Sequence, residues 1–289
     1  MSIYNMLVGV TSGVKDGSSS LRAASSAQAI KTLTGTNTDG VYWIDLPTVG
    51  PTQVYCIMNS SWNGGGWMMA MKATRGTTFN YSANYWSTTN TLNPTDLTRN
   101  DADAKYHVFN YFSALDIMAA WPDIGAGGSI PSVGMWTWLE NNFNNSTRIT
   151  PVNFFGNETG TYATTSPAGV AVSKYGGFFK GLAKSFAGWA SGVFSSQNAI
   201  NFYGFNFYPY PGYSTQAKVR WGFAWNENNE GNYSSPATLA SGAAPGSNDV
   251  SGGIGMDTTF GSHSAGDIIN CCADTTGINR SARVEIYVR

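Results

Sequence analysis

The chain has 289 residues, enough for one large domain or two small ones with a buried core. Hydrophobic residues make up 42% and aromatic residues 14%, which excludes general disorder, whereas only 11% are charged, far below the share of about 25% in soluble domains. With a net charge of −1, the chain has no general attraction for nucleic acid or for acidic membranes.

The N-terminus, MSIYNMLVGVTSGVKDG, lacks the basic start of a signal peptide, and Asn5 and Gly9 interrupt its apolar run. No stretch approaches the ~20 apolar residues that span a bilayer, so we expect no membrane insertion. The sequence predicts an N-terminal arm and flexible Gly/Ser-rich linker over residues 1–24, followed by one folded domain over residues 25–289. The arm could fold back on its own domain or dock on a partner.

The first predicted elements are a short helix and three strands. SSAQAIKTL (25–33) has helical spacing, with Ser25 or Ser26 as the cap. The strands are DGVYWIDL (39–46), TQVYCIM (52–58) and GWMMAMKAT (66–74). Between the last two, Gly64, Gly65 and Gly66 predict a tight turn or bulge with positive φ, because glycine adopts that conformation readily.

The later elements are mostly strands. Residues 104–121 have mixed spacing that includes a helical turn. Strand candidates follow at VNFFG (152–156), AINFYGFNFY (199–208), AKVRWGFAW (217–225) and the alternating SARVEIYVR (281–289). Strands and short helices without βαβ periodicity predict an α+β fold.

The stretch DGVYWIDL…VYCIMNSSWNGGGWMMAMKATRG, within residues 26–76, resembles the opening of fibrinogen-like domains: an Asp-Gly-x-Tyr strand, a Tyr-Cys strand and Gly-Gly-Gly-Trp. In the final third, WNENNEG, SGGIGMD, SAGDIIN and ARVEIYVR are more similar to intelectins. The resemblance implies a fibrinogen-like (intelectin-like) domain with a mixed, mostly antiparallel sheet, short helices and long ordered loops. Proteins of this type also occur among phage virion components, as tail fibres or head decorations.

One departure from the family concerns its first disulfide, which joins the short helix to the Tyr-Cys strand. Cys56 occupies the second position, but Ala27 stands at the first, so the bridge cannot form. Its loss agrees with assembly in a reducing cytoplasm. Cys56 is then expected to be a buried small hydrophobe.

Enzyme motifs fail one by one, and we predict that the chain is not an enzyme. His107 and His263 form no His-x-x-x-His metal pair. GSHSAG (261–266) lacks the glycine that a nucleophile elbow needs two residues before Ser264. No phosphate-binding loop or dinucleotide fingerprint is present. A glycosidase carboxylate pair within the acidic tail stays open as a less favoured alternative.

Cys271 and Cys272 form the chain's cysteine cluster. Adjacent thiols cannot both hold one tetrahedral zinc without other soft ligands. Two packed free thiols and a strained vicinal disulfide both stay open.

Residues 221–279 contain no Lys or Arg, although they contain six carboxylates. Carboxylate, amide and glycine carbonyl oxygens are the ligands of calcium, which takes six to eight of them. We therefore predict a Ca²⁺ site with the candidate ligands Asn226, Glu227, Asn228, Glu230, Asp249, Asp257, Asp267 and Asp274. The alternative is a solvated loop surface whose acids cap turns.

The resemblance implies how such an ion is used. In intelectins, calcium directly coordinates vicinal hydroxyls of a sugar diol, and the family's ligand segments match residues 226–228 and Gly266-Asp267. The family's Glu-His-His element has no equivalent, since SNDVSGG (247–253) stands in its place, and the Asp-x-Asp-Asn motif of fibrinogen is missing. The resemblance thus implies a retained ion whose sugar-coordinating position is altered or lost.

Aromatic side chains are the other candidates for recognition. FYGFNFYPYPGY (202–213) concentrates Phe and Tyr as a sugar-stacking surface does, although its alternation also fits a buried strand. The predicted ligand contacts are Trp225, His263, Tyr208 and Tyr210.

We expect a virion structural protein that acts as a calcium-assisted adhesin for host cell-surface glycans. Its arm would attach to other virion proteins, and a homo-oligomer such as a trimer would give avidity to weak single sites. It would lie on the virion surface after assembly in the host cytoplasm. The rival of another class is a purely structural decoration or fibre subunit, and a glycan hydrolase comes third.

Overall fold

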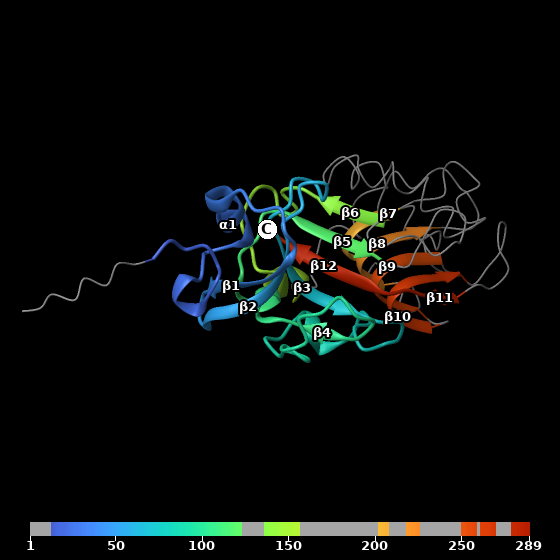
Figure 1. Ribbon diagram of the computed structural model, residues 1–289. Helices are drawn as coiled ribbons and strands as arrows, with labels where there is room; N and C mark the ends of the chain where they lie inside the picture. The colour runs from blue at the N-terminus through green and yellow to red at the C-terminus, as the bar shows by residue number, and fades with distance from the viewer. Residues whose placement is uncertain are drawn as a thin grey trace, which may run out of the picture. The chain divides into compact units, whose positions relative to one another are not determined.

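The computed structural model describes residues 13–122, 136–156, 202–207, 218–225, 250–258, 261–269 and 279–289 (Figure 1). These residues form mostly antiparallel sheet with a few short helices, which confirms the predicted α+β class at that level. The chain divides into two compact units, Met1–Met68 and Met69–Arg289. Within the described ranges, no helix is long and apolar enough to cross a membrane.

The first unit contains the predicted helix. Helix α1 (Ala27–Thr34) begins after Ser26, whose Oγ accepts a hydrogen bond from the backbone N–H of Ala29 at 3.0 Å. It ends at Gly35, which has a φ of 69° and donates its backbone N–H to the carbonyl of Lys31. These are the side-chain cap and the left-handed stop that short helices need, so the predicted helix is confirmed.

Two of the three predicted strands form a hairpin in this unit. Strands β1 (Gly40–Leu46) and β2 (Gly50–Ile57) pair antiparallel along their whole length. Cys56 is fully buried, as expected, and Ala27 is fully buried as well.

Residues 13–24 differ from the flexible linker that their composition predicts. Gly17 accepts a hydrogen bond from the backbone N–H of Trp43, and Ala24 bonds with its N–H to Trp43 and with its carbonyl to Asp45. The short 3-10 helix η1 (Ser20–Arg22) lies between these two anchors. The segment therefore lies along the outer edge of β1, and Ala24 forms a parallel bridge with Ile44. The boundary proposed at residues 24 and 25 stays a prediction.

The glycine triplet forms the predicted turn before strand β3 (Trp67–Ala73), with φ of 90° at Gly64, 73° at Gly65 and 76° at Gly66. A Cβ at Gly65 would lie 2.4 Å from the carbonyl oxygen of Met58, so the backbone passes too close for any side chain. The turn brings Trp67 into the core, where its indole N–H donates to the Trp62 carbonyl at 2.7 Å.

We expect Gly65→Ala to lower the free energy of unfolding by about 2 kcal/mol or more, because it adds a backbone clash to the strain of a positive φ. Gly40→Ala is the matched control, since a Cβ there has nothing within 4 Å and the φ of Gly40 lies outside the positive region that strains other residues. Urea unfolding of both variants checks this, and equal losses would contradict it.

The first sheet of the second unit surrounds the C-terminal strand. It contains part of β3 and the strands β4 (Ala104–Lys105), β5 (Ile117–Trp121), β6 (Trp136–Glu140) and β12 (Val284–Val288). The order is β3-β12-β5-β6, with β4 beside β3, and Figure 1 shows β12 in red next to β5 in green. The short helices η2 (Asn84–Trp86) and α2 (His107–Tyr111) lie between these strands in the chain. The strands predicted at 66–74 and 281–289 are confirmed as β3 and β12, and the helical turn predicted within 104–121 is confirmed as α2.

The second sheet has five strands in the order β11-β10-β9-β8-β7. They are β7 (Phe202–Phe207), β8 (Lys218–Trp225), β9 (Val250–Thr258), β10 (Gly261–Ile269) and β11 (Asn279–Ser281). A row of glycines crosses four of them, because Gly204, Gly222, Gly253 and Gly266 are successive partners in register. A Cβ at Gly253 would lie 2.2 Å from the Trp221 carbonyl oxygen, so this position in the row requires glycine.

The strand predicted at 152–156 is wrong, because these residues belong to helix α3 (Pro151–Gly156). Proline is favoured in the first helical position, and Thr150 before it acts as a cap whose Oγ1 accepts from the backbone N–H of Asn153 at 3.4 Å. The helix supplies Phe154 and Phe155 to an aromatic core that includes Phe205, 4.9 Å from Phe154 between ring centroids.

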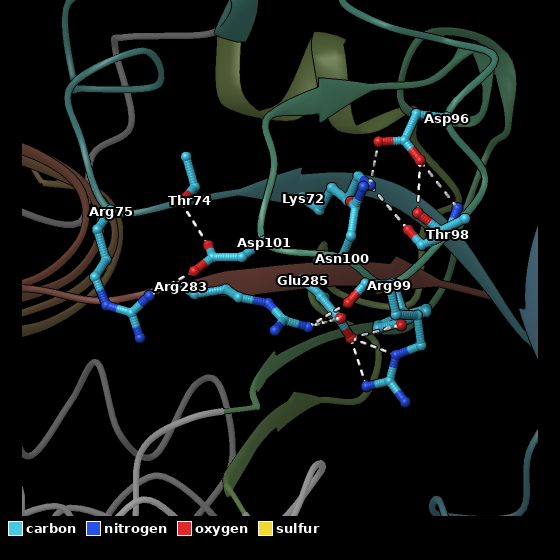
Figure 2. A network of polar contacts seen from close by, with 11 residues as sticks. Lys72, Thr74, Arg75, Asp96, Thr98, Arg99, Asn100, Asp101, Arg283 and Glu285 are labelled. Atoms are coloured by element: carbon cyan, nitrogen blue, oxygen red, sulfur yellow. Dashed lines mark hydrogen bonds and ion pairs between the residues drawn. The ribbon is translucent and has the colours of Figure 1, made fainter.

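Glu285 is a fully buried carboxylate on β12 with donors on both oxygens. Oε2 accepts from Arg99 Nε at 2.8 Å and Nη2 at 2.5 Å and from the Tyr287 hydroxyl at 2.8 Å. Oε1 accepts from Arg283 Nη2 at 3.0 Å (Figure 2). Burial of a charge is tolerated when partners satisfy it in this way.

Lys72 on β3 is buried in the same region and lies in a ring of oxygens. Its ammonium donates to Asp96 Oδ2 at 2.8 Å, to the Thr98 carbonyl at 2.9 Å and to Asn100 Oδ1 (Figure 2). Although desolvation raises the pKa of Asp96, the hydrogen bonds from Lys72 and Thr98 outweigh it and hold that pKa well below its usual range. We call residues 96–100 the lysine loop.

Lys105 on β4 is also buried, but its ammonium group has fewer hydrogen-bond acceptors around it than that of Lys72. Its ammonium donates to the Thr88 carbonyl at 2.6 Å and lies 4.8 Å from the centroid of the Phe109 ring. It pairs with no carboxylate of the described residues. Burial lowers the pKa of Lys105 to about 7.

Replacement by methionine should cost very different amounts of stability at these two lysines. Lys72→Met leaves Asp96 without its cation and should cost about 3–5 kcal/mol of unfolding free energy. Lys105→Met should cost far less at pH 6, because it removes a cation that burial destabilises.

The pH dependence gives the control. Because its folded pKa is lowered, Lys105 binds a proton more readily in the unfolded chain between pH 7 and 10, so its contribution to stability increases with pH. Lys105→Met should therefore compare more favourably with the parent at pH 6 than at pH 9 in urea unfolding. A difference that does not change with pH would contradict this assignment.

Candidate functional site

The register of the second sheet brings the ends of three strands together. Trp225, the last residue of β8, is the partner of Val250, the first of β9, and Val250 is also the partner of Ile269, the last of β10. Asn279, where β11 begins, pairs with Ile268. We call this edge, defined by Trp225, Val250, Ile269 and Asn279, the Trp225 end of the sheet.

Most of the predicted calcium ligands belong to chain segments attached at the Trp225 end. Asp267 lies in β10, two residues before its last residue. Asn226 directly follows Trp225, and Asp249 directly precedes Val250. The predicted residues outside the described part of the chain are Asn226, Glu227, Asn228, Glu230, Asp249, Asp274, Tyr208 and Tyr210, and so are Cys271 and Cys272.

The register also gives Asp267 a neighbour of opposite charge. Asp267 pairs with Gly252 of β9 on one side and with Arg280 of β11 on the other. Cross-strand partners belong to the same face of a sheet, so an arginine position lies next to the position of this aspartate. Arg280 follows directly after the cation-free block 221–279, and the strand pairing makes it the register partner of Asp267.

Asp257 lies at the opposite end of the sheet, opposite Ser262 of β10 and Lys218 of β8. Gly252, the β9 partner of Asp267, is five residues from Asp257, which corresponds to about 16 Å along a strand that rises about 3.3 Å per residue. Two ligands of one calcium ion lie within about 5 Å of each other, since each is 2.3–2.6 Å from the ion. Asp257 and Asp267 therefore cannot hold the same ion.

The contacts of Asp257 give it another role. Its Oδ2 accepts hydrogen bonds from Ser82, from the backbone N–H at 3.0 Å and from the hydroxyl at 2.5 Å. Its Oδ1 is buried and has no hydrogen-bond partner among the residues that the structure describes. Asp257 thus binds the segment before η2 to the C-terminal end of β9.

Two further residues of the second sheet bind the same segment, and no sequence pattern predicted either of them. Ser264, fully buried, donates its backbone N–H to the Gly76 carbonyl at 2.7 Å and accepts the Phe79 N–H on Oγ at 2.9 Å. Arg220 donates Nε to the Tyr81 carbonyl at 2.8 Å. Three residues of the second sheet, Asp257, Ser264 and Arg220, therefore hydrogen-bond to residues 76–82. We call residues 76–82 the anchored segment.

His263 is not beside Trp225. It lies on β10 opposite Met256, which is six residues from Val250, or about 20 Å along the strand. Burial lowers the pKa of His263, and its Nε2 has no hydrogen-bond partner in the described ranges. Of the predicted ligand contacts, the register therefore separates Trp225 from His263.

The glycine carbonyls that were candidate calcium ligands lie in a strand. Gly252 and Gly253 are ladder positions of β9 between β8 and β10. Their backbone groups face neighbouring strands, which leaves the carboxylates and amides as the candidate oxygens. Among the described residues, no group of three or more His, Cys, Asp or Glu side chains could hold a metal ion.

A scan against protein-family models finds no match for the chain, and a search of curated proteins finds none either. The fibrinogen-like and intelectin-like assignment therefore stays a prediction that rests on the residues themselves.

We expect Asp257→Asn to lower the unfolding free energy by about 1–2 kcal/mol, because the bonds to Ser82 lose their charged acceptor. The calcium content of the protein should not change. Ser82→Ala should cause a similar loss, and the double variant should lose less than the sum of the two. Thermal unfolding and elemental analysis check both; loss of calcium in Asp257→Asn would show a ligand instead.

Proposed function

We propose that this chain is a non-enzymatic, calcium-assisted adhesin that binds cell-surface glycans from the surface of a virion. The observation that carries the proposal is the meeting of Trp225, Val250 and Ile269 at one end of the second sheet. The segments 226–249 and 270–278, which carry Glu227, Glu230, Asp249 and Asp274, both begin and end at strands that meet there. A calcium ion needs oxygens from several segments at one place, and a tryptophan at the same end of the sheet suits a sugar ring.

The first unit supports the fibrinogen-like part of the proposal. Its order of capped helix, hairpin, glycine turn and buried Trp67 agrees with what the resemblance implies. Ala27 and Cys56, at the two positions of the missing disulfide, are both fully buried, as a packed replacement of that bridge would be. A fold that keeps this region without a disulfide is suited to assembly in a reducing cytoplasm.

The proposed ligands are now fewer than the sequence suggested. They are Asp267 in β10 and the residues of the two attached segments, Asn226, Glu227, Asn228, Glu230, Asp249 and Asp274. Their oxygens would hold the ion and leave one or two coordination positions for vicinal sugar hydroxyls. Trp225, at the end of β8, would supply apolar contact to the ring of the sugar.

Single sites of this kind bind weakly, so the adhesin would act as an oligomer whose copies bind together. The N-terminal arm would join it to other virion proteins.

A purely structural virion subunit is the second candidate, and one observation favours it. The large apolar side chains that are most exposed among the described residues are all in the first unit: Val14, Leu21, Leu33, Val41 and Val49. Such side chains suit contact with neighbouring subunits. Flat binding to glycans by a correctly assembled particle would favour this candidate.

The Asp267→Ala variant tests the calcium site. It should lose one bound calcium ion per chain, measured by elemental analysis after dialysis, and with it the chelator-sensitive binding to a glycan array. Arg280→Ala is the matched control, because it removes the cross-strand partner of Asp267 and keeps the carboxylate. If Asp267 serves only as the partner of Arg280, both variants lose stability alike and the calcium content stays constant, which would overturn the proposal.

A further inference from the structure

The ammonium group of Lys72 lies between a side-chain carboxylate and a side-chain amide. Its Nζ donates to Asp96 Oδ2 at 2.8 Å and to Asn100 Oδ1 (Figure 2). Lys72 is 1% exposed, whereas Asn100, the last residue of the lysine loop, is exposed. An amine, an amide and a carboxylate that contact one another supply the nucleophile, the electrophile and the proton carrier of an amide transfer.

The hydrogen bond from Lys72 to Asn100 places the amine next to the carbon that it would attack. The amide carbon Cγ of Asn100 is one C=O bond, about 1.2 Å, from Oδ1, so it lies within about 4 Å of Nζ. Reacting atoms that a fold holds about 3–3.5 Å apart react far faster than the same groups in free solution. Amine and amide can therefore react here, although they are inert toward each other when free.

The lysine loop holds Asn100 in place through both of its neighbours in the chain. The carbonyl of Arg99 accepts from Arg283 Nη2 at 2.5 Å. On the other side, Asp101 Oδ2 accepts from Arg75 Nη1 at 2.7 Å (Figure 2). The amide is thus presented from a fixed position, as a reaction between two side chains requires.

Asp96 is suited to carry protons and not to form the new bond itself. Although desolvation raises its pKa, hydrogen bonds from Lys72 and Thr98 hold the pKa of Asp96 well below its usual range. The side chain of Asn100 also lowers this pKa, so the amide lies close to the carboxylate. A carboxylate accepts protons and resists attack by an amine. The Thr98 carbonyl is a backbone amide whose attack would cut the chain, which leaves Asn100 as the electrophile.

We propose that Lys72 and Asn100 become joined by an isopeptide bond between Nζ and Cγ, with Asp96 as the catalytic residue that moves the protons. Asp96 Oδ2 takes a proton from the ammonium, and the neutral amine attacks Cγ. The bond between Cγ and Nδ2 then breaks, and its electron pair stays on Nδ2. Two of the three ammonium protons pass through Asp96 to Nδ2, which leaves as an ammonium ion, and Asp96 is again a carboxylate. The reaction needs no oxidant.

The bond is a covalent cross-link within the second unit. It joins residue 72 on β3 to residue 100, next to Arg99, which binds Glu285 on β12. Like a disulfide, such a cross-link restricts the unfolded chain and so favours the folded one. Unlike a disulfide, it forms under reducing conditions. The ion pair of Lys72 with Asp96 is the starting state of the reaction, and the inference rests on neither the calcium site nor the proposed function.

Mass spectrometry of the denatured full-length protein tests the bond. The parent chain should be lighter than its sequence requires by one molecule of ammonia. Trypsin should fail to cleave after Lys72, and the digest should contain a branched peptide that joins residues 32–75 to residues 100–105. Fragmentation of that peptide should locate the branch at Lys72 and Asn100.

Asn100→Ala is the decisive variant, because Asn100 is exposed and its replacement leaves the ion pair of Lys72 with Asp96 in place. It should lose no ammonia, be cleaved normally after Lys72 and unfold at a lower temperature than the parent. Lys105→Met is the matched control. Lys105 is also buried, but its ammonium donates to the backbone carbonyl of Thr88, so this variant should still form the bond.

Two further variants test the roles in the reaction. Lys72→Arg keeps the charge beside Asp96, but a guanidinium does not attack an amide, so the variant should retain its full mass. Asp96→Ala should also retain its full mass, because the ammonium then has no carboxylate to take its proton. Loss of ammonia in Asp96→Ala would contradict the role of this residue.

Three results would overturn the bond itself. A parent chain of full mass that trypsin cleaves after Lys72 would show that the oxygens only bind the ammonium. Loss of ammonia without the branched peptide would indicate a succinimide at another asparagine, such as Asn63 before Gly64. A branch at Asp96 with loss of water would make the carboxyl group, and not the amide, the partner of Lys72.

Discussion

The buried carboxylate of Glu285 is the constraint on which the second unit depends. It lies in β12, between β3 and β5, where Arg99, Arg283 and Tyr287 all donate hydrogen bonds to it. Arg99 belongs to the loop before β4, so one interaction ties that loop to the last strand of the chain. The sheet is therefore incomplete until the final residues are in place.

This arrangement makes the fold strongly non-local. Arg99 and Glu285 are 186 positions apart, and the hydrogen bond of Phe79 to Ser264 spans 185. Contacts of such separation form late, because the loop between them must be closed first. The second sheet is joined to the rest of its unit by the same kind of contact, through Asp257, Ser264 and Arg220, all of which hold the anchored segment.

Much of the fold could be predicted from the sequence where the signal was local. The Ser26 cap, the positions of strands β1 and β12 and the glycine triplet each depend on a few adjacent residues, and each was predicted correctly. No strand was predicted at residues 250–258, because the glycine row is a cross-strand feature that no single strand reveals. In α3, two phenylalanines suggested a strand, but Thr150 and Pro151 start a helix.

The candidate site was predicted less well, for a physical reason. Composition identified an acid-rich segment, but coordination depends on which residues share an end of the sheet, and that is decided by register. Asp257 and Asp267 are ten residues apart in the chain, and the antiparallel pairing of β9 with β10 puts them at different positions along two neighbouring strands. Arg280 likewise becomes a neighbour of Asp267 through strand register and not through the sequence.

The lysine loop has a consequence of its own. Oxygens of Asp96, Thr98 and Asn100, at alternate positions, converge as they do in loops that take up a metal ion, but the charge at their centre belongs to Lys72. A cation attached to the polypeptide is present at unit stoichiometry from the moment of synthesis and cannot be washed out or exchanged. This part of the protein should therefore keep its shape in compartments where free divalent ions are scarce, because its oxygens bind a lysine and need no ion from solution.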